Sequence, residues 1–81
     1  MTLKQLHDVT YIKYVKLGDK KLEVKTEHTR NNEWNYFELD DEKIYDYDWY
    51  IYDVDGVYAD LYYVHYEAVP CLVVVVNKRR N

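Results

Sequence analysis

The stretch of sequence that most directly indicates the fold is residues 45–66, YDYDWYIYDVDGVYADLYYVHY. On both sides of Asp55-Gly56, aromatic and β-branched residues alternate with carboxylates, and a period of two is typical of β-strands. Asp-Gly readily supplies the positive φ angles of a type I′ hairpin turn. The segment therefore predicts an antiparallel hairpin that turns at Asp55-Gly56, with strands at residues 45–54 and 57–66.

Shorter strands are predicted on either side of this hairpin. In residues 21–28, Leu22 and Val24 share one face while charged side chains share the other, as in a half-buried strand. The apolar run at residues 71–76 is typical of a central strand covered on both faces, and Pro70 is expected to end the strand before it. The remaining predicted elements are a strand at 9–16, a turn at 17–20 and a strand at 33–39.

One short helical turn is expected at the start of the chain, because Thr2 precedes Leu3 and Leu6 and is suited to act as an N-cap. Sustained helical periodicity is absent elsewhere. The sequence thus predicts a mainly β fold, either a single small antiparallel sheet or a partly closed barrel of about five to six strands, with room for one short N-terminal helix.

The size of the chain predicts one domain. With 81 residues, a single domain over residues 1–81 with one core is expected, and its last residues, 77–81, are expected to form a solvated basic tail. The single cysteine, Cys71, cannot form an internal disulfide, which is typical of a protein in a reducing cytosol. No segment resembles a signal peptide or reaches the ~20 apolar residues of a membrane helix. We therefore expect a cytoplasmic protein.

Charge is distributed unevenly along the chain, whose net charge is −4. Residues 1–32 and 68–81 each have a balance of +3, whereas residues 33–67 contain eleven acids and one base, Lys43, a balance of −10. The acids there alternate with large rings, which solubilising surfaces normally avoid. We interpret residues 33–67 as an acidic, tyrosine-rich binding surface. The simpler alternative is a solvated face that only keeps the domain soluble.

Strand geometry suggests what such a surface would bind. Residues two apart in a strand share a face about 6.6 Å apart, close to the roughly 6–7 Å between phosphates along one DNA strand. Carboxylates such as Asp46 and Asp48 would then imitate phosphates and occupy a basic, nucleic-acid-binding site on a protein, while tyrosines supply contact area. The candidate partner-binding residues are Glu38, Asp40, Asp41, Glu42, Tyr45, Asp46, Tyr47, Asp48, Tyr50, Tyr52, Asp53, Asp55, Tyr58 and Asp60.

Two other functions stay open. One is a structural or regulatory domain that forms a homodimer through the apolar strand at residues 71–76, since an exposed apolar edge invites pairing with a second copy. The other is a module that binds single-stranded nucleic acid by stacking bases on aromatic rings. Direct binding to nucleic acid is disfavoured, because the rings lie in the segment whose balance is −10, which repels phosphates.

No catalytic, metal or cofactor site is predicted, and we do not expect an enzyme. The sequence has no serine for a serine triad, and no local motif pairs Cys71 with a histidine. His7, His28 and His65 are too widely spaced for a zinc motif. The Asp-rich stretch before Gly56 lacks the ligand spacing of a calcium loop.

In composition the chain resembles the small accessory proteins of bacteriophages and other mobile elements, being very short, acidic and rich in Lys, Asn, Asp and Tyr. Such proteins inhibit host or defence enzymes, some of them by DNA mimicry. The resemblance implies an inhibitor or modulator that acts in the bacterial cytoplasm on a basic, nucleic-acid-processing host or defence protein. It includes no motif, so no residue role is taken from it.

Overall fold

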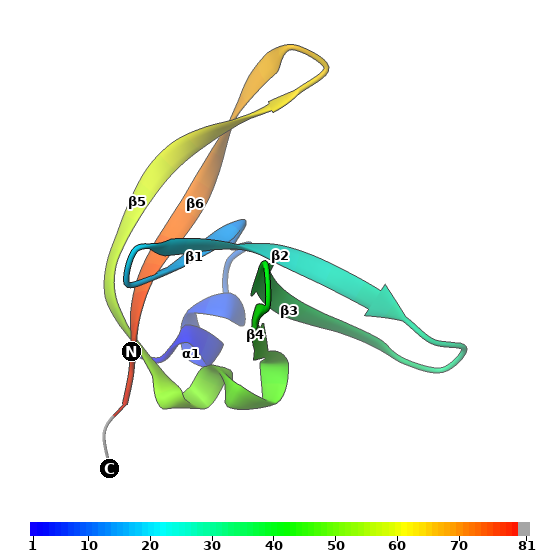
Figure 1. The fold of residues 1–81 in the computed structure, drawn as a ribbon, viewed down its shortest axis with the longest axis vertical. Helices are drawn as coiled ribbons and strands as arrows, with labels where there is room; N and C mark the ends of the chain where they lie inside the picture. The colour runs from blue at the N-terminus through cyan, green and yellow to red at the C-terminus, as the bar shows by residue number, and fades with distance from the viewer. Residues whose placement is uncertain (80–81) are drawn as a thin grey trace.

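The computed structural model describes residues 1–79. Six strands form one open sheet in the order β4-β3-β2-β1-β6-β5, in which only β1 and β6 are parallel (Figure 1). The predicted mainly β fold with one short N-terminal helix is confirmed, and the sheet is not closed into a barrel. The elements are α1 (Leu3–His7), β1 (Tyr14–Leu17), β2 (Lys20–His28), β3 (Glu33–Leu39), β4 (Glu42–Tyr45), the 3₁₀-helix η1 (Asp46–Ile51), β5 (Tyr52–Val64) and β6 (Glu67–Lys78).

The strands predicted from half-buried alternation are confirmed. β2 and β3 match residues 21–28 and 33–39 to within one residue. β1 begins at Tyr14, later than predicted, because the chain after α1 first passes through a loop in which the N–H groups of Val9 and Thr10 bond to the carbonyl of Leu6. Gly18, in the turn that follows, has a φ of +61°, a left-handed conformation that glycine adopts without steric cost.

The predicted hairpin turn at Asp55-Gly56 is wrong. β5 continues through these residues, and the register shift between Val54 and Gly56 is a β-bulge. The chain turns instead at His65 and Tyr66, both with positive φ, after which β6 pairs with the whole of β5. Pairing along the full length of the valine-rich β6 outweighs the local turn preference of one dipeptide.

The predicted strand at residues 45–54 is wrong over residues 46–51, because the chain leaves β4 after Tyr45, forms η1 and enters β5 only at Tyr52. A strand would place Trp49 on the same face as Tyr47. The 3₁₀-helix, with about three residues per turn, directs Trp49 into the core and leaves Tyr47 and Tyr50 exposed. Burial of one large ring therefore decides the conformation of this segment.

Two predictions about the C-terminal strand need correction. Pro70 does not end a strand but lies within β6, opposite Leu61. Proline is tolerated there because β1, the neighbour of β6 on the side away from β5, pairs only with Val73–Val76. No strand on that side needs the N–H that proline lacks. The predicted solvated tail at residues 77–81 is wrong for residues 77–79. β6 extends to Lys78, and the N–H of Arg79 donates to the carbonyl of Ile51 at 2.6 Å. Residues 80 and 81 lie outside the described residues.

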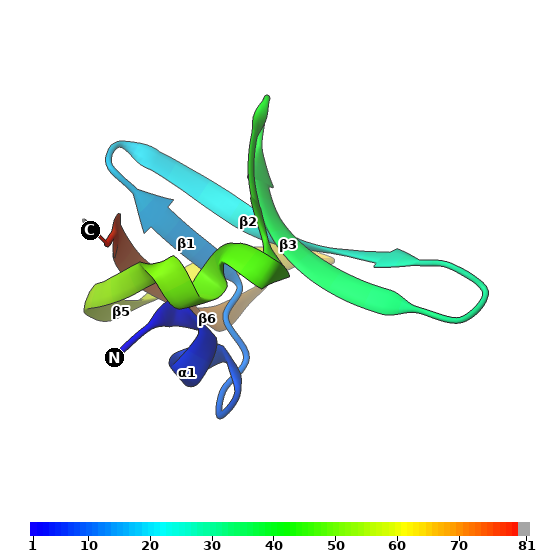
Figure 2. The ribbon, with the colours of Figure 1, turned by 90° about the horizontal axis from the view of Figure 1, so that it is seen from below.

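The core lies between one face of the sheet and the two short helices, α1 and η1, which pack against each other (Figure 2). As predicted, residues 71–76 belong to a central strand: Val74 and Val76 are buried in this core, and Val73 is buried against the opposite face. Since β1 and β5 flank β6 at Val73–Val76, this stretch has no open edge that could pair with a second copy. The buried residues of this core are Leu3, Ile12, Val15, Leu22, Phe37, Ile44, Trp49, Val74 and Val76.

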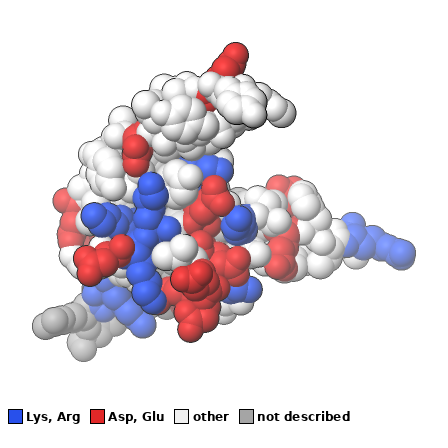
Figure 3. All heavy atoms as spheres, turned by 45° about the horizontal axis from the view of Figure 1, so that its top comes forward, with Lys and Arg blue, Asp and Glu red and all other residues white. Residues whose placement is uncertain are grey.

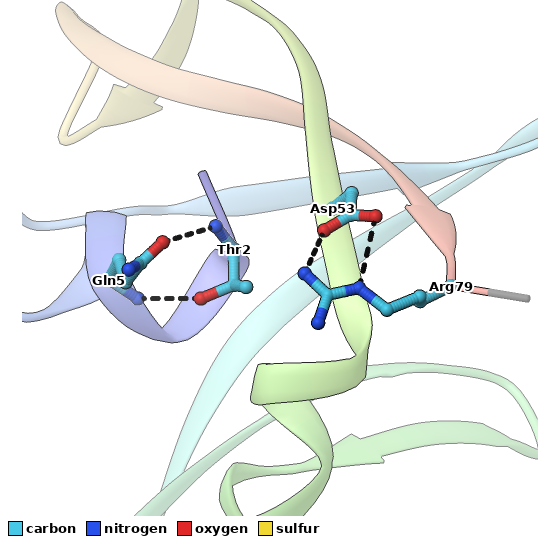
Figure 4. Close-up of polar contacts among 4 residues, drawn as sticks. All are labelled: Thr2, Gln5, Asp53 and Arg79. Carbon is cyan, nitrogen blue, oxygen red and sulfur yellow. Dashed lines mark hydrogen bonds and ion pairs between the residues drawn. The ribbon is translucent and has the colours of Figure 1, made fainter. Parts of the chain in front are cut away.

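The predicted cap of the N-terminal helix is confirmed as a capping box. The Thr2 hydroxyl accepts from the N–H of Gln5 at 3.2 Å, and the N–H of Thr2 donates to the Gln5 side chain at 2.8 Å (Figure 4). Thr2→Ala is expected to lower the free energy of unfolding by about 1 kcal/mol, as loss of such caps does elsewhere. Urea unfolding measures this, with Thr10→Ala, an exposed loop position, as a control that should change stability little. Equal effects of the two changes would contradict a capping role.

Candidate partner-binding site

The predicted binding residues do not form one continuous strand surface. They fall on three separate parts of the fold: the end of β3 with the β3–β4 turn and β4, the segment from Tyr45 through η1, and β5. The first group contains Glu38, Asp40, Asp41 and Glu42. The second contains Tyr45, Asp46, Tyr47, Asp48 and Tyr50. The third contains Tyr52, Asp53, Asp55, Tyr58 and Asp60.

Several of the predicted carboxylates are neutralised within the protein, which the sequence did not indicate. Their ion pairs, by closest atoms, are Glu38 with Lys43 at 3.3 Å, Glu42 with Lys20 at 2.9 Å, Asp53 with Arg79 at 2.7 Å, and Asp60 with Lys21 at 3.4 Å. Among residues 1–79, the predicted carboxylates without an ion-pair partner are Asp40, Asp41, Asp46, Asp48 and Asp55. The charge available to a partner is therefore smaller than the sequence suggests.

The pair between Asp53 and Arg79 fixes the end of β6 to the start of β5. The guanidinium donates from Nη2 at 2.7 Å and from Nε at 3.4 Å, one bond to each carboxylate oxygen (Figure 4). These bonds hold the pKa of Asp53 below its ordinary value. The pKa of Asp60 is also lowered, chiefly because the N–H of Leu61 donates to it, with Lys21 as the next cause. Both carboxylates serve the fold.

The spacing that suggested imitation of phosphates is absent. Asp46 and Asp48 lie in the 3₁₀-helix η1, where residues two apart point in different directions. Asp53 and Asp55 lie in β5 but on either side of the bulge, and Asp53 is paired. The regular 6.6 Å row expected of a strand therefore does not form at either pair.

The tyrosines among the predicted binding residues divide into two kinds. Tyr47 and Tyr50 are 67% and 60% exposed, and Tyr58 is also exposed. Tyr45 and Tyr52 are half-buried. The Tyr45 ring stacks on that of Tyr47, with centroids 5.4 Å apart and planes at 6°. Because this stacking orders Tyr47, it presents a fixed aromatic surface beside the free carboxylates Asp46 and Asp48.

A hollow of about 440 Å³ opens between α1, the start of β3 and η1. We call it the α1–η1 hollow. Lys4 and Asp8 form an ion pair with each other. The other carboxylates at its wall are Asp46, which has no ion-pair partner among the described residues, and Glu33, which lies 3.6 Å from Nδ1 of His28. Its lining residues are Lys4, His7, Asp8, Glu33, Trp34, Asn35, Asp46, Tyr47 and Trp49.

His7 adds no positive charge to this hollow at neutral pH. Its ring lies 4.4 Å from that of Trp49 between centroids. Burial lowers the pKa of His7, and nearby Lys4 lowers it further, whereas Asp8 and Asp46 act in the opposite direction with smaller effect. The hollow thus combines two carboxylates with aromatic rings. Carboxylates and ring faces are the groups that bind an ammonium or guanidinium.

The lowered pKa of His7 predicts a fall in stability on mild acidification. The unfolded chain takes up this proton near pH 6.5 and the folded protein only at lower pH. The contribution is therefore complete above about pH 6.5 and is lost as the pH falls toward the folded pKa. Carboxylates with lowered pKa, such as Asp53, lose their contribution only at more acidic pH, below about 4. Between about pH 6.5 and pH 4, the free energy of unfolding of the wild type, measured with urea, should fall with pH, and His7→Gln should remove this dependence. An equal pH dependence in both proteins would contradict the assignment to His7.

The structure also exposes residues that sequence reasoning did not select. Leu61, Tyr63 and Tyr66, near the end of the β5–β6 hairpin, are 53%, 72% and 102% exposed. A signal was present, because residues 61–66, LYYVHY, contain no Asp, Glu, Lys or Arg within the otherwise acidic segment. Tyrosine is also favoured in strands, where it packs against its neighbours, so this pattern alone does not identify a binding surface.

Within residues 1–79, no three His, Cys, Asp or Glu side chains are grouped as metal ligands would be. Nor does any described helix have the length and apolar character needed to cross a membrane. Comparison of the chain with protein-family models, with curated proteins and with solved structures found no significant match.

Proposed function

We propose that this protein is a protein-binding inhibitor or modulator, which uses the acidic surface around η1 to occupy a basic site on its partner. The observation that carries the proposal is the α1–η1 hollow, where Glu33 and Asp46 lie beside exposed Tyr47. A lysine or arginine side chain of the partner fits this chemistry, because its alkyl stem packs on the rings while its charge meets the carboxylates.

The charged and aromatic residues of η1 have different roles in binding. Asp46 and Asp48 have no ion-pair partner among the described residues, so their field attracts a basic partner and raises the association rate. Tyr47 and Tyr50 offer large exposed rings whose desolvation supplies affinity. This division predicts binding that weakens steeply as salt rises.

The proposal does not depend on imitation of a DNA backbone, since the regular row of carboxylates is not formed. It requires only a basic site with at least one accessible lysine or arginine. The compositional resemblance to phage and mobile-element accessory proteins supports a partner in a bacterial host, among the proteins that act on nucleic acid, because their binding sites are basic.

Affinity capture from a nuclease-treated bacterial lysate at low salt tests the proposal. We expect a basic protein that elutes as salt rises, and whose affinity falls at least about tenfold when Asp46→Asn and Asp48→Asn are combined. Asp19→Asn, an exposed carboxylate in the β1–β2 turn, is the matched control and should bind like wild type. Binding that is insensitive to salt, or equally weakened by the control, would overturn the proposal.

A further inference from the structure

The β5–β6 hairpin extends beyond the rest of the sheet as a two-stranded arm, residues 59–72, which projects from the body in Figure 1. β1, the other neighbour of β6, pairs only with Val73–Val76. Within the arm, therefore, no described strand pairs with β6 on its other side. An isolated two-stranded ribbon is at best marginally stable in water, so the arm lacks a covering layer.

One face of the arm continues the core face of the sheet. Val74 and Val76 of β6 are in the core, and Leu72 packs against it. Because side chains alternate along a strand and opposite residues share a face, the same face continues outward along both strands. Its members in the arm are Ala59, Leu61, Tyr63, Ala68, Pro70 and Leu72. The two helices cover this face over the body, but over the arm Leu61 and Tyr63 remain exposed.

This inner face carries no charge. The only charged residues of the arm are Asp60 and Glu67, which lie on its opposite face, and Asp60 is paired with Lys21. In Figure 3 the charged atoms gather on the body, and the arm is largely free of them. An acidic or a basic partner would therefore find no complementary charge on the inner face. Two copies of the face can meet about a two-fold axis without repulsion, because every contact of one residue with another is repeated in reverse and neither residue is charged.

The exposed side chains of the arm supply part of the area that a dimer needs. Leu61 and Tyr63, with Tyr66 at the tip, expose on the order of 400 Å² if a whole tyrosine contributes ~200 Å², and Ala68 and Pro70 of the inner face are also exposed. A specific interface buries about 600–1,000 Å² per partner. The backbone of β5, the end strand of the sheet, supplies further contact area.

The turn at the tip adds an independent observation. His65 and Tyr66 have φ angles of 50° and 68°, a conformation that Asn-Gly adopts at lower cost. Tyr66 is nevertheless fully exposed at this position, where its ring contributes nothing to the monomer. Residues held in such a costly backbone conformation cluster at functional sites such as ligand clamps.

The geometry points to a second copy of this chain as the partner of the arm: two arms pack about a two-fold axis, inner face against inner face, and bury Leu61 and Tyr63. This interface is separate from the acidic surface around η1, so either proposal can fail alone.

Sedimentation equilibrium of the full chain, from micromolar to submillimolar concentration, tests the dimer. Wild type should approach twice the chain mass of 10.0 kDa. Leu61→Lys combined with Tyr63→Lys should weaken self-association at least about tenfold, since each change removes a buried apolar side chain. Val9→Lys is the matched control, because Val9 is 76% exposed but lies in the α1–β1 loop, and it should associate like wild type.

Hydrogen exchange of wild type gives a second readout that needs no variant. Amides of the arm should gain protection as concentration rises, while those of the β2–β3 hairpin should not. The proposal would be overturned if the wild-type mass stayed at that of one chain, or if the double variant associated as tightly as wild type. It would also be overturned if amides outside the arm gained protection while those of the arm did not.

Discussion

Replacing Trp49 with alanine is expected to lower the free energy of unfolding by about 3–5 kcal/mol, the usual cost of truncating a buried large aromatic residue. Trp49 is 2% exposed, and its ring centroid lies 5.3 Å from that of Phe37. Its Nε1 donates to the carbonyl of Ile44 at 3.2 Å. The change therefore removes apolar contacts and a buried hydrogen bond together, and leaves that carbonyl without its partner.

Such a loss is a large part of the stability of a small domain, which is about 5–15 kcal/mol. Urea unfolding followed by circular dichroism measures it, with Tyr50→Ala as the control, because Tyr50 belongs to the same 3₁₀-helix but is 60% exposed. The control should change stability by no more than about 0.5 kcal/mol. A small effect of Trp49→Ala would mean that η1 does not close the core, and the α1–η1 hollow would then lack its floor.

The parts of the fold that the sequence predicted correctly are those with a local cause. The cap at Thr2, the turn at Gly18 and the alternation of β2 each depend on a few neighbouring residues. The central position of the valine-rich β6 was also predictable, because a continuous apolar run requires cover on both faces.

The errors concern contacts between distant segments. Asp55-Gly56 has the composition of a turn, but pairing β5 with the whole of β6 moves the turn to His65 and Tyr66, which no local preference favours. The alternating sequence around Trp49 is typical of a strand, but Trp49 is buried in the core because residues 46–51 form a 3₁₀-helix. Both outcomes depend on tertiary packing, which overrides local propensity.

The candidate site was misjudged for the same reason. The sequence shows which residues are acidic but not which bases reach them, and Arg79 reaches Asp53 from 26 residues away. Neutralisation by Lys20, Lys21 and Lys43 likewise requires the register of the sheet. When the paired carboxylates are left out, the predicted carboxylates that keep a free charge lie in η1, in the β3–β4 turn and at Asp55.

Changing His65→Asn and Tyr66→Gly together is expected to raise the free energy of unfolding of the monomer by about 1–2 kcal/mol. Left-handed backbone costs a residue with a side chain roughly 1–2 kcal/mol, and Asn-Gly is the preferred sequence for a two-residue turn with two positive φ angles. Neither native side chain offsets this cost in the monomer, since both residues are exposed. Unfolding is measured at a dilution where the chain is monomeric, because dimerisation adds its own concentration-dependent stability.

The same double variant should self-associate more weakly than wild type, because it lacks the ring of Tyr66 at the tip of the arm. Gly18→Ala is the converse control: Gly18 has a φ of +61° with open space around it, so an added methyl group should destabilise the fold by about 1 kcal/mol without affecting self-association. If the turn variant were both more stable and equally associated, Tyr66 would have no role in the interface. If it were less stable, the cost assigned to the left-handed backbone of His65 and Tyr66 would be contradicted. A variant that gains stability and loses association would show that the natural turn sequence gives up folding free energy to keep an aromatic ring at the binding surface.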